Sequence, residues 1–217
     1  MYADEHQIHA ITPLAEQHFR TFTGEHLVSM MDNFFKLVFD NPNYLNLTND
    51  AQGRVLEKYI LVQMEKQRRF KAKLYIVDNS IAKENWNTYI LDITHLSVKH
   101  FKTTKPYYFT NVDLNNQSIL AIPVSPNYPG IDAAIWDCKT QTLYPISMTI
   151  SKQHSQNFDY NLWGDSIRQK LQKSNDWTPN INFVWIRTTS TGMSNQDRFV
   201  MLNDLDSIVF PLINYWK

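Results

Sequence analysis

The chain has 217 residues, of which 43% are hydrophobic and 13% aromatic, and its 21 basic residues balance its 21 acidic residues. So many apolar and aromatic side chains exclude an intrinsically disordered chain, and balanced charges exclude a global field that attracts nucleic acid or membrane. Cys138 is the only cysteine, which excludes an intramolecular disulfide and a thiolate zinc cluster.

Several common functional signals are missing from the sequence. Neither GxGxxG, nor GxxxxGK[ST], nor GxSxG can be written anywhere, which excludes the usual nucleotide-binding loops and the commonest serine-hydrolase signature. Residues 1–10 carry acids and histidines instead of a basic start followed by an apolar run, so we expect no signal peptide. No run approaches about 18 apolar residues, so we expect no membrane-spanning helix. We expect either an intracellular protein or a piece of a larger protein that reaches its destination by other means.

Two helices are expected in the first third of the chain. Apolar residues recur at helical spacing over residues 24–40, and Asn41-Pro42 ends this helix. Asp50 is expected to cap a second helix over residues 51–69. The following residues, 70–122, mix polar and aromatic side chains and predict strands joined by irregular links.

A hairpin is expected near the middle of the chain. Residues 131–136 predict a short strand directly after a turn at Pro129-Gly130. Residues 144–151 alternate between apolar and polar side chains, which is typical of a half-buried strand. The two strands are close enough in the chain to pair as neighbours.

The last part of the chain alternates between helices and strands. Residues 157–173 predict an amphipathic helix, and the apolar run 181–186 predicts a central strand covered on both faces. A further strand is expected over residues 199–202 and a closing helix over residues 205–216.

The order of these elements predicts an α/β fold in which helices flank a mixed β-sheet. The length suits one compact unit with a substantial core. We expect residues 1–45 to form an N-terminal helical region packed on a core of residues 46–217.

Glu57 is the first candidate functional residue. Its neighbours at helical spacing are Gly53, Ile60 and Leu61, so its carboxylate lies on or beside the apolar face of the helix. An unpaired carboxylate is costly to bury, so Glu57 requires a partner cation, a metal ion or an opening to solvent. The alternative is a boundary glutamate that reaches water or pairs with a basic neighbour.

Asp132 is the second candidate, at the start of the expected strand 131–136. Strict alternation places it with Ala134 and Trp136 on one face, and Ile131 with Ala133 on the other. A hard cation such as Mg²⁺ takes a few carboxylate oxygens together with water and phosphate, and acids from a helix and from the start of a strand can supply them. The alternative is an aspartate that caps the preceding turn.

Three segments resemble motifs of one nuclease-like family, in the same order. Gly53-Arg-Val-Leu-Glu57, followed by Arg69-Phe-Lys71, resembles a GxxxE helix with a trailing basic strand. Pro126-Asn-Tyr-Pro-Gly-Ile-Asp-Ala133 resembles the element P-x-N-[FY]-P-x-[IV]-D-A, and Thr149-Ile-Ser-Lys-Gln-His154 resembles QxT-[VI]-S-x-x-H. On these motifs, roughly residues 25–186 resemble the restriction-endonuclease-like PD-(D/E)XK domain of Crinkler effectors and of trypanosomal retrotransposon hot spot proteins.

The resemblance implies a restriction-endonuclease-like fold, a Mg²⁺- or Mn²⁺-dependent DNA endonuclease and an effector that acts in the nucleus. It assigns metal binding to Glu57 and Asp132. The wider superfamily places an acid and a lysine two residues apart in the third motif, where this chain has Ser147 and Thr149. This departure puts catalysis in question.

Two further residues of the third motif are candidates for chemistry. Lys152 is the nearest replacement for the missing lysine, but alternation points it to the opposite face from Ser147 unless the strand end is bulged. His154 is a candidate for phosphate contact or proton transfer, and a structural role in the turn after the strand is equally open.

A basic stretch surrounds the end of the second expected helix. Its cations either follow the phosphate backbone of DNA or complement the helix dipole at a solvated helix end. Two functions therefore stay open: a degenerate metal-dependent DNA endonuclease, and an inactive module of the same fold that binds nucleic acid or a protein partner. The sequence does not assign the oligomeric state. The cations of the stretch that we expect to contact DNA are Arg54, Lys66, Arg68, Arg69, Lys71 and Lys73.

Overall fold

The computed structural model describes residues 33–41, 43, 46–67, 71–76, 87–101, 112–123, 128, 130–150, 157–188, 198–201 and 205. A short helical segment at residues 33–39 comes first. The elements that follow are α3 (Asn49–Gln67), β1 (Lys71–Ile76), β2 (Asn87–Asp92), β3 (Ser97–Phe101), β4 (Ile119–Pro123), β5 (Ala133–Asp137), β6 (Thr142–Thr149), α4 (Tyr160–Lys170), β7 (Asn180–Ile181), β8 (Val184–Arg187) and β9 (Arg198–Met201).

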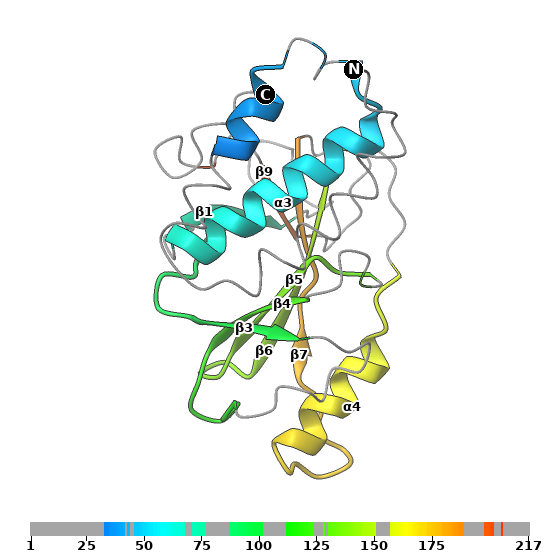
Figure 1. Ribbon diagram of the computed structural model, residues 1–217. Coiled ribbons are helices and arrows are strands. Elements are labelled where there is room, and N and C mark those ends of the chain that lie inside the picture. Colours follow the sequence, from blue (N-terminus) through cyan, green and yellow to red (C-terminus); the bar gives the residue numbers. More distant parts are fainter. Residues whose placement is uncertain are drawn as a thin grey trace.

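The strands form one mixed sheet (Figure 1). Their order is β2-β1-β9-β8-β6-β5-β4-β3, and β7 pairs with β6 beside this path. The pairs β1–β2, β1–β9, β4–β5 and β5–β6 are antiparallel, whereas β3–β4, β6–β7, β6–β8 and β8–β9 are parallel. Strand β6 therefore lies in the middle of the sheet, with an antiparallel neighbour on one side and a parallel neighbour on the other.

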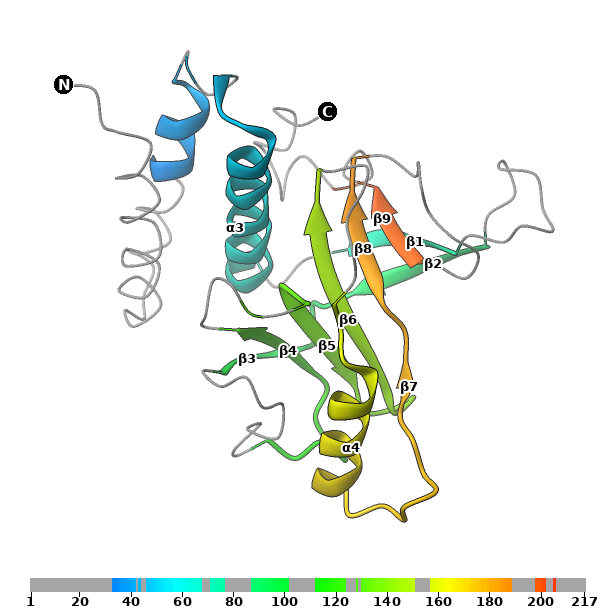
Figure 2. The same ribbon diagram turned by 90° about the vertical axis from the view of Figure 1, so that its right-hand side faces the viewer.

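The helices α3 and α4 cover opposite faces of this sheet. On β8, Val184 and Ile186 belong to the core cluster of α3, whereas Trp185 belongs to the cluster of α4. Helix α3 lies beside the C-terminal half of β6, and α4 lies toward the other end of that strand (Figure 2). The expected α/β class, with helices flanking a mixed sheet, is confirmed.

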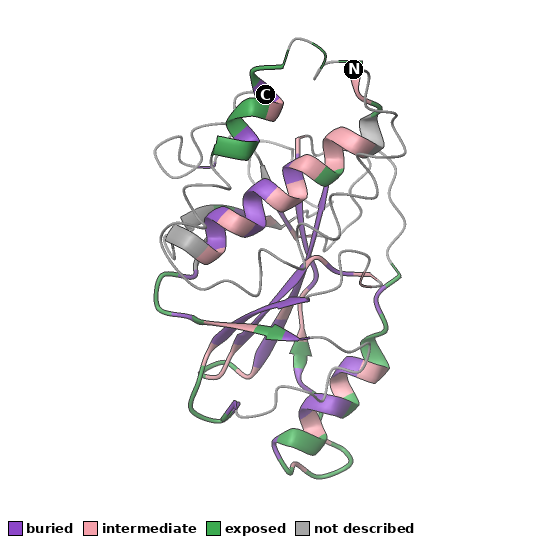
Figure 3. Cartoon of the chain, viewed as in Figure 1, coloured by how far each residue is buried: buried purple, intermediate pink, exposed green. Residues whose placement is uncertain are grey.

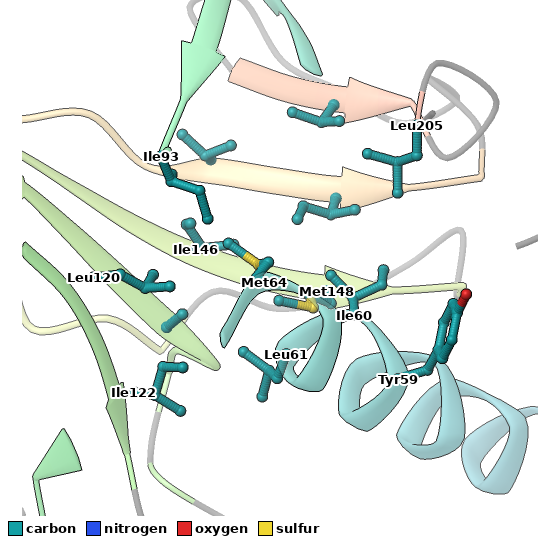
Figure 4. Close-up of a cluster of buried hydrophobic side chains, with 14 of the residues drawn as sticks. Tyr59, Ile60, Leu61, Met64, Ile93, Leu120, Ile122, Ile146, Met148 and Leu205 are labelled. Atoms are coloured by element: carbon teal, nitrogen blue, oxygen red, sulfur yellow. The ribbon is translucent and has the colours of Figure 1, made fainter. Parts of the chain in front are cut away.

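The larger core cluster holds α3 against the sheet. Ile60 and Met64 of α3 point toward Ile146 and Met148 of β6 (Figure 4), and all four side chains are buried. Full burial of an aliphatic side chain of this size contributes about 1.5–3 kcal/mol. This packing fixes the height of α3 above β6 and with it the position of every other side chain on that helix.

The segment 33–39 packs on α3 through aromatic rings. The ring centroids of Phe35 and Phe39 lie 5.5 Å and 6.0 Å from that of Tyr59, in edge-to-face geometry. Such pairs contribute about 0.5–1.5 kcal/mol beyond the area that they bury. The expected boundary between residues 45 and 46 stays a prediction.

The start of α3 differs from the expectation. The helix begins at Asn49, and Thr48 caps it, because its hydroxyl accepts a hydrogen bond of 3.3 Å from the backbone N–H of Ala51. Asp50 lies inside the first turn, so its assignment as the cap is wrong. Both residues are good capping types, and the sequence pattern alone selected the later one.

Strand β6 is more deeply buried than its alternating sequence predicts. The pair β5–β6 forms the expected hairpin, and Ile146 and Met148 face α3 as expected. The polar side chains between and beyond them, Ser147 and Thr149, are buried as well. Figure 3 colours the central strands of the sheet mostly as buried. The expectation of a half-buried strand is wrong because both faces of this central strand are covered.

The remaining elements match the expectations in part. Helix α4 is confirmed over a shorter range, and β9 is confirmed at the expected place. The expected strand 181–186 is divided between β7 and β8 by an interruption at residues 182–183. The expected helices over residues 24–40 and 205–216 lie outside the described residues, except for residues 33–40 and Leu205.

Candidate metal centre

Helix α3 places Glu57 at the boundary of the apolar face. Leu56 and Ile60 are fully buried, and Gly53, one turn earlier, lies against Ile150 at the end of β6. The side chain of Glu57 is itself only 14% exposed. A carboxylate with so little access to water needs a cation close to it.

Asp132 lies directly before β5 and caps the open end of the ladder between β5 and β6. Its Oδ2 accepts hydrogen bonds from the backbone N–H of Met148 at 2.7 Å and from the hydroxyl of Ser147 at 3.4 Å. The carboxylate thus takes the place that the carbonyl of a further β5 residue would occupy. This bond fixes the orientation of the carboxylate at the sheet end.

The backbone beside Asp132 breaks the expected alternation. The N–H of Asp132 donates to the carbonyl of Ile146 at 2.8 Å, although Ala133 is the register partner of that residue. Two residues therefore oppose one, as in a β-bulge. Ile131 consequently packs with Ala134 on the face of α4 and not with Ala133, so its expected placement is wrong, whereas the expected separation of Ala134 and Trp136 from Ala133 is confirmed.

Glu57 and Asp132 lie close enough for the charge of one carboxylate to act on the other. Burial raises the pKa of the Asp132 carboxyl, and the negative charge of Glu57 raises it further, to about 8. The Met148 N–H, the charge of Lys58 and the Ser147 hydroxyl act in the opposite direction on this pKa. Two carboxylates from distant parts of the chain therefore share one partly buried environment at the end of the sheet.

Lys58 pairs with Glu57, which confirms the alternative of a boundary glutamate with a basic neighbour, although the sequence did not single out this lysine as a site residue. Its Nζ lies 2.7 Å from Oε1 of Glu57, and its side chain is only 15% exposed. Its charge also acts on Asp132. Glu57 and Lys58 are adjacent in the sequence, but this was a weak signal for the contact, because adjacent residues of a helix usually point in different directions.

The third motif is only partly at this site. The Ser147 hydroxyl contacts Asp132, but Ser147 and Thr149 stand on the face of β6 opposite to Met148 and therefore opposite to α3. Thr149 is the register partner of Arg187 on β8, which is 5% exposed. Thr149 is thus not brought to Glu57.

The other sequence candidates are placed only in part. Arg54 on α3 and Lys73 on β1 are exposed. Lys66 and Lys71 are placed by their backbone alone, at the end of α3 and the start of β1. The remaining candidates lie outside the described residues, and their roles stay predictions: Arg68, Arg69, Lys152 and His154.

The donor set fits a hard divalent cation. Mg²⁺ and Mn²⁺ take oxygen ligands, and Mg²⁺ in particular is held by one or two carboxylates with water and substrate phosphate completing the shell. Glu57 and Asp132 supply two such carboxylates. The positively charged ammonium of Lys58 already contacts the carboxylate of Glu57. Within the described ranges, no group of three or more His, Cys, Asp or Glu side chains converges.

Comparisons of the chain with protein-family models, with curated proteins and with solved structures found no match. Among the helices that the structure describes, none combines the length and the apolar character needed to cross a membrane.

Proposed function

We propose that this chain is a divalent-cation-dependent DNA endonuclease domain with a restriction-endonuclease-like fold. The observation that carries the proposal is the electrostatic coupling of Glu57 and Asp132, two acids with little access to water. The resemblance of the three sequence motifs to Crinkler-type effectors supports the choice of DNA as the ligand and of the nucleus as the place of action.

The site supports metal-assisted hydrolysis because it places two carboxyl groups, those of Glu57 and Asp132, within electrostatic reach of each other at a sheet end. When bound, Mg²⁺ or Mn²⁺ supplies a Lewis acid that polarises a phosphoryl oxygen and lowers the pKa of a bound water. Asp132 is held by the Met148 N–H, so one carboxylate oxygen is fixed while the other stays available. Glu57 approaches from α3 and supplies the second carboxylate.

The residues around the two acids have supporting roles in this proposal. Ser147 donates its hydroxyl to Asp132 and favours the ionised carboxylate, which is the form that binds a cation. Lys58 balances part of the negative charge. Arg54 and Lys73 are exposed cations that can contact DNA phosphates.

A second candidate function follows from the third motif. Ser147 and Thr149 offer no carboxylate, and neither position carries a lysine for the attacking water or the leaving oxygen. This feature favours an inactive module of the same fold that binds DNA or a protein partner without cleavage. The two candidates differ in the outcome of a cleavage assay.

Supercoiled plasmid separates the two candidates. The chain, Glu57→Gln and Asp132→Asn are incubated with plasmid and Mg²⁺ or Mn²⁺, and nicking is followed on a gel. Asp165→Asn is the matched control, because Asp165 is an exposed acid on α4 that pairs with Arg168. Nicking by the chain and the control, but not by the other two variants, supports the endonuclease. Equal nicking by all four proteins excludes catalysis at this site, and DNA binding without any nicking favours the inactive module.

A further inference from the structure

Lys58 and Glu57 form a close ion pair on α3, near the end of β6. The Nζ of Lys58 lies 2.7 Å from Oε1 of Glu57, which is the distance of a charge-assisted hydrogen bond. The exposed fractions of the two side chains, 15% and 14%, distinguish this pair from the exposed pairs that contribute little to stability. The ion pair is therefore a mostly buried, well-defined part of the site.

The ammonium of Lys58 also acts on the second carboxylate. Its positive charge favours the ionised form of Asp132, against the combined effects of burial and of Glu57. The ammonium of Lys58 thus contacts Glu57 directly and acts electrostatically on the Asp132 carboxyl. A divalent cation entering between the carboxylates would meet a positive group already in contact with one of its ligands.

We propose that Lys58 is a built-in counter-cation that competes with the divalent cation for Glu57 and is displaced when the metal ion binds. The proposal rests on the proposed function, because it takes the two acids as the metal ligands. It adds a regulatory consequence: the affinity for metal is set below what the two carboxylates alone would give.

Displacement of Lys58 requires no movement of α3. The ammonium stands on a flexible stem of four carbons, so rotation of the side chain alone moves the charge away from Glu57. The core contacts of Ile60 and Met64 below the site stay unchanged during such a rotation. After displacement the ammonium stays beside the site, where a phosphate group is a suitable new partner.

The test measures the binding of Mn²⁺ alone by isothermal titration calorimetry. The proteins are the full chain, Lys58→Met, Glu57→Gln and the control Lys139→Met, whose lysine lies exposed in the turn at the far end of β5. Loss of a charge-assisted contact at the ligand corresponds to a change of about tenfold, so we expect Lys58→Met to bind Mn²⁺ about tenfold more tightly than the chain. Lys139→Met is expected to bind as the chain does.

The outcomes separate this proposal from the proposed function. Unchanged or weaker binding by Lys58→Met overturns the competition, while loss of binding in Glu57→Gln still supports the metal site. An equal increase in Mn²⁺ affinity for Lys58→Met and Lys139→Met also overturns the competition, because the increase would then come from the change in net charge. If no protein binds Mn²⁺, both proposals are rejected.

Thermal unfolding provides a second measurement, which distinguishes a lysine that competes with the metal ion from one with only a structural role. Without divalent cation, we expect a lower melting temperature for Lys58→Met, because its two carboxylates have lost their counter-cation. Mn²⁺ should raise the melting temperature of Lys58→Met more than that of the chain. An equal rise in both proteins contradicts the proposal. If Lys58→Met does not fold alone, recovery of the folded state with Mn²⁺ supports the proposal, and failure to recover overturns it.

Discussion

Oδ2 of Asp132 accepts a hydrogen bond of 2.7 Å from the backbone N–H of Met148, and this bond ties the candidate metal ligand to the central strand of the sheet. The same carboxylate lies within electrostatic reach of Glu57 on α3. One short contact therefore joins the architecture of the sheet to the chemistry of the site.

Stability should fall as pH rises, because of Asp132. An unfolded aspartate has a pKa of about 3.9, whereas burial, and then Glu57, raise the pKa of Asp132 in the folded chain to about 8. Between these values the folded state holds the proton more tightly, so its stabilising contribution is complete below the lower value and is lost as pH approaches the upper one. We expect a loss of roughly 1 kcal/mol for each pH unit in that window.

The variant Asp132→Asn isolates this effect, because an amide cannot ionise but keeps an acceptor oxygen for Met148. Urea unfolding between about pH 5 and pH 8 should give a flatter stability profile for Asp132→Asn than for the chain without metal. Asp165→Asn should keep the profile of the chain. Parallel profiles for the chain and Asp132→Asn would show that Asp132 does not bind this proton.

Replacement of Asp132 by alanine should cost more than replacement by asparagine. Alanine leaves the Met148 N–H without its acceptor near the end of a buried strand. An unsatisfied buried donor costs about 1–3 kcal/mol. Denaturant unfolding at the low end of the same pH range measures the difference, and faster exchange of the Met148 amide should accompany it. Equal stability of the two variants would contradict the capping role.

Two glycines near the site should respond in opposite directions to alanine. A Cβ on Gly53 would meet Ile150 Cγ1 at 3.6 Å, which is an ordinary contact. We therefore expect Gly53→Ala to stabilise the chain by about 0.5–1 kcal/mol through helix propensity. Gly130 has φ of +82°, and a Cβ there would lie 2.7 Å from the carbonyl oxygen of Asn157. Gly130→Ala should destabilise the chain by at least about 1–2 kcal/mol, and a neutral result in denaturant would contradict this backbone conformation.

Binding to DNA should depend on salt through exposed cations of α3 and β1. If Arg54 and Lys73 contact phosphates, the double variant Arg54→Gln/Lys73→Gln should bind more weakly, with a salt slope reduced by about one for each contact removed. Fluorescence anisotropy with duplex DNA at several salt concentrations measures the slope. Lys139→Gln is the matched control. The same slope in all three proteins would exclude these two cations from the interface.

Much of the architecture was predictable because periodicity reports which face of an element is buried. The alternation of Ile146 and Met148 predicted their common face, and the spacing of Ile60 and Met64 around Glu57 predicted the helix that carries it. The bulge at Asp132 was not predictable, because a strand pattern does not reveal where two residues oppose one.

The residues that surround Glu57 and Asp132 were harder to predict than the two acids themselves. The contact of Lys58 with Glu57 depends on the rotamers of both side chains and on the docking of α3 above β6, and neither is encoded in a local pattern. The burial of Ser147 depends on neighbours from distant parts of the chain, which the alternation of β6 alone does not report. The roles of all these residues in metal binding and cleavage stay predictions.

Mn²⁺ calorimetry near neutral pH on the chain, Glu57→Gln, Asp132→Asn and the control Asp165→Asn tests most directly whether the two acids share one cation. We predict one binding site in the chain and in the control, and an affinity at least about tenfold lower in each of the other two variants. Equal affinities in all four proteins, or loss of binding in only one of the two acid variants, would contradict a shared site.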